Sequence, residues 1–309
     1  MSELFLGVDG GQSGTTAIIG DEDGRLLGAG QAGPSNCPGD PDASAKFSAA
    51  ITSALHAACV NAGLEPTSQR FAGACFGLSG GPEGREAALR HMVPTDRMLV
   101  TTDADIALTG ALAGDPGIVV IAGTGSIAYG RNAEGQTARA GGWGFMLGDE
   151  GGAFWIARAA IRAALRFEEG WGPPTSLRAL LLDATRSRSL NELMHRCYAR
   201  EFTRARIASL AVFVNIAAER GDMTAVDILS QAALELVTIA RAIHGQLFGS
   251  SEMVLCSHAG GVFHSRLLRV RFREEIGKTR GLQLIPPRHT PAFGAFLRAV
   301  LLKSRVSPF

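Results

Sequence analysis

The chain carries one arrangement of strands and turns twice, and this repeat constrains its fold more than any other feature. In residues 4–29 an apolar strand, a glycine turn, a second strand, an Asp-Gly turn and a third strand follow one another. Residues 117–139 repeat that order with different side chains. Because short glycine turns join neighbouring antiparallel strands, each copy predicts a three-stranded meander. The repeat indicates two α/β halves, with a boundary at the Gly/Pro-rich break near residues 114–117.

The segments after each meander show helical periodicity mixed with short apolar runs. Apolar residues at helical spacing predict a helix over 43–63, and a buried strand is predicted over 71–78. Further helices are predicted at 151–167, 202–220, 225–248 and 262–275, strands at 253–256 and 282–285, and a turn at 257–261. We therefore predict an N-terminal domain at 1–114, a larger C-terminal domain at 115–290, and a closing helix within 291–309 that packs back on the first domain.

The composition is that of a globular protein without a strongly charged binding surface. The 309 residues carry a formal net charge of +1, so neither nucleic acid nor a membrane surface is an expected partner. The first residues lack the basic start and long apolar run of a signal peptide. The five cysteines are scattered and form no Cys-x-x-Cys pair, so no zinc site or disulfide framework is predicted. A reducing, cytoplasmic location fits this pattern best.

Asp103 stands where a strand predicted at 97–100 gives way to a helix predicted at 106–112. A carboxylate at this point lies at the carboxyl end of a strand, where open α/β sheets bind ligands. Our hypothesis is that Asp103 is a general base between two phosphate-binding turns. The alternative is an aspartate that only caps the helix. The glycine turns upstream and downstream favour the base.

Those two glycine turns have the properties of phosphate-binding loops. Glycines such as Gly11 and Gly125 expose backbone N–H groups without interference from a Cβ atom. Ser13 and Thr124 add hydroxyl donors, and Asp9 could hold Mg2+ through water. Neither turn matches a Walker A loop or a Rossmann fingerprint, since the Lys is missing and each turn leads into a strand. The alternative is a pair of ordinary hairpins.

Three further features carry side chains suited to a small polar ligand. The glycine-rich segment 141–152, GGWGFMLGDEGG, sets an aromatic face beside acids, which suits sugar hydroxyls, although the acids could also cap a helix. Gly260 and Gly261 precede a predicted helix and could let an adenine ring approach the backbone, or form a plain loop. Asn36 could read a hydroxyl through its amide or be a turn residue.

Taken together, these motifs resemble those of the N-acetylglucosamine kinase and BadF/BadG-type ATPase family, within the sugar kinase, Hsp70 and actin superfamily. The resemblance covers nearly the whole chain and rests on five motifs in the expected order, at 8–13, 101–104, 122–126, 141–152 and 260–261. It implies an α/β fold of two ribonuclease-H-like (actin/Hsp70-type) lobes with a nucleotide- and sugar-binding cleft between them.

The resemblance also implies roles for individual residues. Asp103 would take the proton from the sugar 6-hydroxyl as it attacks the γ-phosphate, and Asp9 would lie near Mg2+. The residues expected to bind ATP are Gly10, Gly11, Gln12, Ser13, Thr124, Gly125, Gly260 and Gly261. The residues expected to line the sugar pocket are Asn36, Asp103, Ser126, Trp143, Gly144 and Asp149. A homodimer is also implied. Gln12 departs from the family, which commonly has a third glycine there.

The implied reaction is ATP-dependent phosphorylation of an amino sugar, foremost N-acetylglucosamine to N-acetylglucosamine 6-phosphate. A kinase for glucosamine or another amino sugar is the nearest alternative. An activator ATPase of a radical dehydratase belongs to the same superfamily, but it would need cysteine thiolates for an iron–sulfur cluster. A nucleotide-binding regulator without transferase activity would not need both Asp103 and Asp149.

Overall fold

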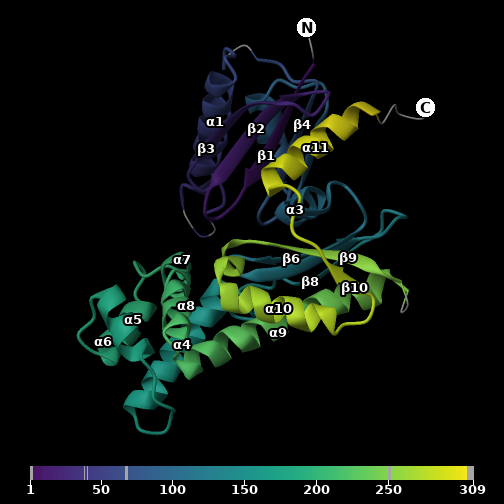
Figure 1. Cartoon of the computed structure of the whole chain (residues 1–309). Helices are drawn as coiled ribbons and strands as arrows, with labels where there is room; N and C mark the ends of the chain where they lie inside the picture. The colour runs from purple at the N-terminus through teal and green to yellow at the C-terminus, as the bar shows by residue number, and fades with distance from the viewer. Residues whose placement is uncertain (1–2, 38, 40, 67–68, 250–251, 305–309) are drawn as a thin grey trace. The chain divides into compact units, whose positions relative to one another are not determined.

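The computed structural model describes residues 3–37, 39, 41–66, 69–249 and 252–304 (Figure 1). The described residues form two compact units. The first contains the residues up to Asp115 together with those from Pro286 onward, and the second contains Pro116–Ile285. Each unit is built on one five-stranded mixed sheet, so the predicted α/β class is confirmed.

The sheet of the first unit has the strand order β3-β2-β1-β4-β5. Its strands are β1 (Leu4–Gly10), β2 (Thr15–Asp21), β3 (Leu26–Ala32), β4 (Gly73–Leu78) and β5 (Met98–Thr102). The first three form an antiparallel meander, whereas β4 and β5 run parallel to β1. Its helices are α1 (Ala43–Asn61), α2 (Glu86–Met92), α3 (Asp103–Leu112) and α11 (Pro291–Ser304).

Helices cover both faces of this sheet. Successive side chains of a strand point to opposite faces, and β1 is buried on both. Leu6 and Val8 belong to one core cluster with Phe47 of α1, whereas Phe5 belongs to a second cluster with Phe296 of α11. Figure 1 shows α1 beside β3 and α11 along β1. The strand ends, rather than the sheet faces, are therefore left to carry function.

Helix α11 approaches β1 and α3 closely because glycines line the contact. A Cβ atom at Gly7 would overlap the backbone of Phe296, and one at Gly294 would overlap the carbonyl oxygen of Ile106. The end of the chain therefore completes the first unit. Residues 305–309 of the predicted closing segment lie outside the described residues.

The sheet of the second unit has the order β10-β9-β6-β7-β8, the same topology as the first. Its strands are β6 (Gly117–Ala122), β7 (Ser126–Arg131), β8 (Thr137–Gly141), β9 (Val254–Ala259) and β10 (Leu282–Leu284). Its helices are α4 (Ala153–Glu168), α5 (Leu177–Thr185), α6 (Leu190–Tyr198), α7 (Arg204–Ala208), α8 (Ala211–Glu219), α9 (Met223–Leu247), the 3-10 helix η1 (Gly261–His264) and α10 (Arg266–Gly277). The predicted internal repeat thus appears as two sheets of one topology.

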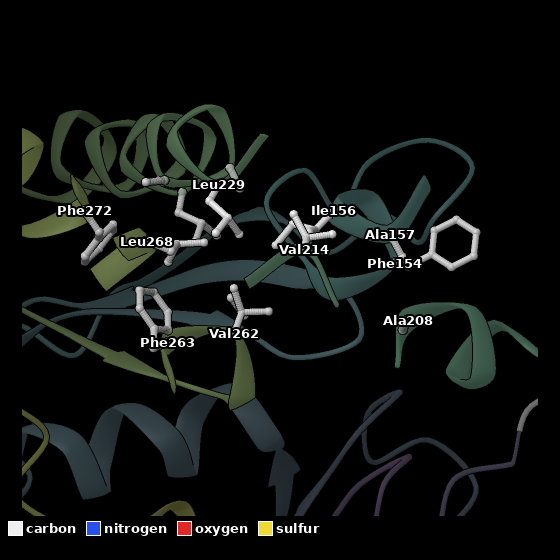
Figure 2. Packing of buried hydrophobic residues seen from close by; sticks show 14 of the residues in the cluster. Phe154, Ile156, Ala157, Ala208, Val214, Leu229, Val262, Phe263, Leu268 and Phe272 are labelled. Atoms are coloured by element: carbon white, nitrogen blue, oxygen red, sulfur yellow. The ribbon is translucent and has the colours of Figure 1, made fainter. Parts of the chain in front are cut away.

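The core of the second unit joins its sheet to the helices inserted after β8. Figure 2 shows Leu229 of α9 near Leu268 of α10, and Val214 of α8 beside Ile156 of α4. Helix α9 is long and apolar enough to cross a membrane by length and composition alone. Because α9 packs along β7 and β8 with a buried face, it is a core helix of this unit and only weak evidence for a membrane span.

Three predicted boundaries in this unit were wrong. The helix predicted at 202–220 is divided into α7 and α8, and Ser209 at the break bonds through its hydroxyl to the carbonyl of Arg206 (2.7 Å). Such local side-chain bonds compete with helix continuation. The helix predicted at 262–275 divides at Ser265, which caps α10 by accepting the N–H of Leu268. The turn predicted at 257–261 starts later, because β9 continues to Ala259.

Candidate active site

Parallel pairing brings three strand ends to one edge of the first sheet. Gly10 of β1 pairs with Leu78 of β4, which in turn pairs with Thr102 of β5. The residues that follow these strands therefore leave the sheet at the same level. One of them, Ser79, donates its backbone N–H to the carbonyl of Gly10 (2.9 Å). Asp103 follows Thr102, so the register carries the predicted base to this edge.

Asp103 is the first residue of α3 and is not its N-cap. The cap is Thr102, whose hydroxyl accepts the backbone N–H of Asp105 (3.2 Å). Asp103 instead accepts the N–H of Ala104 through Oδ1 (2.9 Å), and the hydroxyl of Ser79 is a further donor to its carboxyl group. Thr102, and not Asp103, therefore caps α3.

Asp103 and Asp9 are carboxyl groups in a site that disfavours their charge. Burial raises the pKa of Asp103, and the hydrogen bonds from Ala104 and Ser79 offset part of that rise. Burial, with a smaller contribution from the negative charge of Asp103, raises the pKa of Asp9 to about 7. Within the described part of the chain, no Lys or Arg lies at ion-pair distance from either group.

Asp105 lies two residues further along α3 and has a different environment. Its carboxylate accepts the hydroxyl of Thr101 (3.2 Å) and pairs with Arg298 of α11 (3.3 Å). It is buried, and these bonds tie α3 to α11. The same helix turn therefore holds one structural acid and one acid without a cationic partner among the described residues.

The first glycine turn is closed by its own backbone and supports the loop that carries Asn36. Gly11 donates its N–H to the carbonyl of Gly14 (2.9 Å). The carbonyl of Gly11 accepts the N–H groups of both Ser35 (3.1 Å) and Asn36 (3.3 Å). Gln12 and Ser13 are exposed at the tip. The Gln12 side chain thus lies on the solvent side of the turn.

Asn36 belongs to a polar cluster that the sequence did not indicate. Its side-chain oxygen accepts a bond from Nη2 of Arg85 (3.2 Å), while Nη1 of Arg85 donates to the carbonyl of Ser79 (3.0 Å). Since Ser79 also bonds to Asp103, the cluster links the predicted base to the predicted sugar-reading amide.

The second glycine turn is anchored on the start of α4. Gly123 donates its N–H to the carbonyl of Gly125 (2.9 Å). The carbonyls of Gly123 and Thr124 accept the N–H groups of Ala153 (2.9 Å) and Phe154 (3.0 Å). The first amides of α4 therefore hold the turn in place, and its geometry is set by a helix rather than by the hairpin alone.

Asp149 lies directly beneath this turn, where Arg204 holds it. Its carboxylate Oδ2 is 2.6 Å from Nη2 of Arg204, and the aspartate is 4% exposed with a left-handed backbone (φ 63°). A Cβ atom at Gly125 would overlap this carboxylate, so only glycine fits there. The Arg204 guanidinium also lies over the ring of Phe145, 5.4 Å from its centroid.

The remaining predicted sugar residues differ in how free their side chains are. Ser126 is buried and donates its hydroxyl to the carbonyl of Glu150 (2.6 Å). Trp143 is 64% exposed, with the Arg139 guanidinium 4.5 Å from the centre of its ring system. Gly144 has a left-handed backbone (φ 84°) with open space at its Cβ position. Trp143 and Gly144 therefore present an accessible surface, whereas the Ser126 hydroxyl already has a structural partner.

Gly260 and Gly261 are glycines for different reasons. Gly260 has φ 99°, and a Cβ atom there would overlap the carbonyl of Ala122 at the end of β6. Gly261 has ordinary backbone angles, and nothing lies within 4 Å of its Cβ position. Packing accounts for Gly260, while the space beside Gly261 is open to a ligand.

The profile of the BadF/BadG/BcrA/BcrD ATPase family matches residues 6–299. The chain belongs to this family. It is 33% identical to the N-acetylmuramic acid/N-acetylglucosamine kinase of Clostridium acetobutylicum, over 96% of this chain and 98% of that protein. It is 30% identical to the N-acetyl-D-glucosamine kinase of Dictyostelium discoideum over 59% of this chain and 60% of that protein. A Chromobacterium violaceum crystal structure, provisionally named N-acetylglucosamine kinase, has a TM-score of 0.79 at 29% identity and covers 97% of this chain and 99% of that one.

The family match and the similar crystal structure confirm the predicted resemblance and the two-lobe fold. Three polar residues of the site were missed by the sequence analysis. Ser79 could have been found, because it follows a predicted strand that is parallel to β1. Arg85 and Arg204 carry no local signal, since their partners Asn36 and Asp149 lie 49 and 55 residues away.

Proposed function

We propose that this chain transfers the γ-phosphoryl group of ATP to the 6-hydroxyl of an amino sugar, with N-acetylglucosamine as substrate. The observation that carries the proposal is Asp103, a half-buried carboxyl group at a strand end, whose pKa is raised by desolvation. It neither caps its helix nor pairs with a cation among the described residues. Relatives named as N-acetylglucosamine kinases support the choice of substrate.

In this proposal Asp103 accepts the proton of the sugar hydroxyl as the oxygen attacks the γ-phosphorus. A raised pKa favours this step, because a base works best when its pKa approaches the working pH. The N–H of Ala104 and the hydroxyl of Ser79 fix the direction of the carboxylate. A positioned base of this kind contributes about 10²–10⁴-fold to the rate.

The chemistry of Asp9 fits Mg2+, which binds to one or two carboxylates together with phosphate oxygens. Burial is the largest cause of the raised pKa of Asp9, and no Lys or Arg among the described residues pairs with it. Asp9 would hold the ion through water. The ion would neutralise charge on the β- and γ-phosphates during transfer.

The remaining assignments follow the two glycine turns. In the proposal the phosphates are bound by Gly10, Gly11, Gln12, Ser13, Thr124 and Gly125. The adenosine is bound by Gly260 and Gly261. The sugar is bound by Asn36, Ser126, Trp143, Gly144 and Asp149, along with Asp103. The open space at Gly261 and the exposed ring of Trp143 support these assignments. A cytoplasmic homodimer completes the proposal.

The cysteines argue against the activator ATPase as an alternative. Cys59, Cys75 and Cys256 are buried, and burial raises their pKa values, so they stay protonated. Iron–sulfur clusters need thiolates. A glucosamine kinase remains the alternative of the same class.

The test is ADP release from ATP and Mg2+ in the presence of N-acetylglucosamine, glucosamine, N-acetylgalactosamine, N-acetylmuramic acid or glucose. We expect turnover that depends on N-acetylglucosamine, with the phosphorus nucleus of the product coupled to the protons at C6. Faster turnover with glucosamine would favour the alternative kinase. Strong turnover without any sugar would contradict the proposed transferase.

A further inference from the structure

Arg85 lies beside the proposed sugar site and bonds to two of its residues. Nη2 of this residue donates to the amide oxygen of Asn36, and Nη1 donates to the carbonyl of Ser79. The guanidinium lies 5.3 Å from the centroid of the Phe47 ring, which supports it from the core. Arg85 itself is half-buried, so part of the guanidinium remains accessible.

The charge of Arg85 is not balanced by the described residues. No carboxylate there lies within ion-pair distance of it, although exposed Arg90 of α2, the helix that begins after Arg85, pairs with Glu86 (2.7 Å). A guanidinium has five N–H donors, and Arg85 uses two in the bonds above. Three donors remain on a planar group whose geometry matches a carboxylate.

We propose that Arg85 binds a carboxylate carried by the sugar, so that the substrate class of this site includes an acidic amino sugar. This rests on the proposed function, because Asn36 and Asp103 place the sugar next to Arg85. Neutral N-acetylglucosamine offers Arg85 only hydroxyl and amide oxygens. A lactyl ether, as in N-acetylmuramic acid, offers an anion.

The position of the partners supports this proposal over a purely structural role. Arg85 donates to the side chain of Asn36 and to the carbonyl of Ser79. The side chain of Ser79 in turn bonds to Asp103. A Cβ atom at neighbouring Gly80 would lie 3.3 Å from the Asn36 amide nitrogen and 3.7 Å from Nη2 of Arg85. The glycine leaves room beside both donors. The Clostridium relative, whose name includes N-acetylmuramic acid, is consistent with an acidic substrate.

The experiment compares kcat/KM for N-acetylmuramic acid, its methyl ester and N-acetylglucosamine. The ester keeps the bulk of the lactyl group and removes its charge. For the wild type we expect the acid to exceed the ester by about 10-fold or more, as for a charge-assisted hydrogen bond. Arg85→Gln should lower kcat/KM for the acid by about 30-fold. The same variant should lower kcat/KM for the two neutral sugars only about threefold, because Asn36 loses the bond from Arg85.

Two further variants separate charge from geometry. Arg85→Lys should retain part of the preference for the acid, because it keeps the charge and loses the planar fork. Arg90→Gln removes a positive charge from an exposed ion pair on the adjoining helix α2 and should change none of the three kcat/KM values. An equal loss for all three sugars in Arg85→Gln, or a wild type that does not distinguish acid from ester, would overturn the inference.

Failure of the proposed function would show differently. If none of the sugars is phosphorylated, the transferase proposal fails, and calorimetry with N-acetylmuramic acid alone then decides about Arg85. Binding to the wild type that is lost in Arg85→Gln and kept in Arg90→Gln would still support an acidic-sugar site. No binding to the wild type would overturn it.

Discussion

The two sheets share one strand order, yet only the first carries acids at its strand ends. β1 ends with Asp9-Gly10, and β6 ends with Ile121-Ala122 at the corresponding positions of its hairpin. The contrast recurs at the outer strands, where Asp103 follows β5 but Ile285 follows β10. One topology therefore occurs in two chemical versions.

The proposed function gives a physical reason for the difference between the versions. Phosphate oxygens are negative, so carboxylates near them need a cation, whereas neutral backbone N–H groups do not. The first sheet presents acids that fit Mg2+ and proton transfer. The second presents a glycine turn held by α4 and an aspartate already neutralised by Arg204. In that proposal the repeat provides the scaffold, and the side chains at the strand ends determine which chemistry each sheet supplies.

The largest expected effect tests whether Asp103, the acid after β5, takes part in proton transfer. Asp103→Asn should lower kcat by about 10²–10⁴-fold, because an amide cannot accept the proton. Stability should hardly change, since Thr102 caps α3. Steady-state kinetics with coupled ADP detection measure the first effect, and thermal unfolding measures the second.

The control is Asp105→Asn on the same helix turn. It leaves Arg298 without its buried partner and should lower the free energy of unfolding by about 3 kcal/mol. The kcat of the folded fraction should remain near wild type. If Asp103→Asn destabilises the protein as much as Asp105→Asn, Asp103 is structural and the two sheets differ less than proposed.

The repeated fold could be predicted because its signals are local. Apolar strands and glycine turns within about 25 residues predict each meander. Short apolar runs predict the parallel strands. The helices inserted after β8 were harder. At the break between α7 and α8 the Ser209 hydroxyl bonds to the carbonyl of Arg206, and hydrophobic periodicity does not predict such a bond.

The site was predictable where chain order places a residue at a strand end. Asp9 and Asp103 follow from that rule together with parallel register. Arg204 does not, because it reaches Asp149 from a segment without a motif, 55 residues away. Tertiary packing, not sequence spacing, created that pair.

The second prediction compares two neighbouring glycines of the second unit. Gly260→Ala should lower the free energy of unfolding by about 2–4 kcal/mol, because φ 99° and the nearby carbonyl of Ala122 leave no room for a Cβ atom. Gly261→Ala should leave stability unchanged and raise KM for ATP. Chemical denaturation and kinetics at varied ATP distinguish the two.

These glycines also test the role given to the second sheet. If the Gly261 variant binds ATP as well as the wild type, the open space there is not occupied by the nucleotide. The backbone of the second unit would then lose its proposed share in nucleotide binding, while the acids of the first sheet would be unaffected.

The third prediction concerns the pH dependence that the acids confer on the first unit. The pKa of Asp9 is about 7 in the folded protein and 3.8 ordinarily, so the folded state holds a proton that the unfolded chain releases. Unfolding free energy should therefore fall as pH rises from about 4 to 7, by about 2 kcal/mol after allowance for partial exposure. Above pH 7 the dependence should level off.

Asp9→Asn provides the comparison for that slope. It should flatten the curve between pH 4 and 7 and be more stable than the wild type at pH 8, while losing activity. Denaturation curves at each pH supply the measurement. An unchanged slope in the variant would show that Asp9 is ionised in the folded state without a cation, which would weaken the case for Mg2+ there.

The smallest expected effect asks what the neutralised aspartate of the second unit does. Arg204→Met removes the guanidinium that holds Asp149 and should raise KM for the sugar about 10-fold, because the buried carboxylate loses the bond that fixes its position. Values of kcat and of KM for ATP should change less than about twofold. Arg206→Met, on the same helix with its guanidinium over Phe202, serves as the control.

A double variant sharpens the result. If Arg204 acts through Asp149, adding Arg204→Met to Asp149→Asn should cost little more than Asp149→Asn alone. If KM for ATP rises instead of KM for the sugar, the pair supports the phosphate turn through its contact with Gly125. The second sheet would then bind nucleotide alone, and sugar recognition would fall to the unit that already holds the acids.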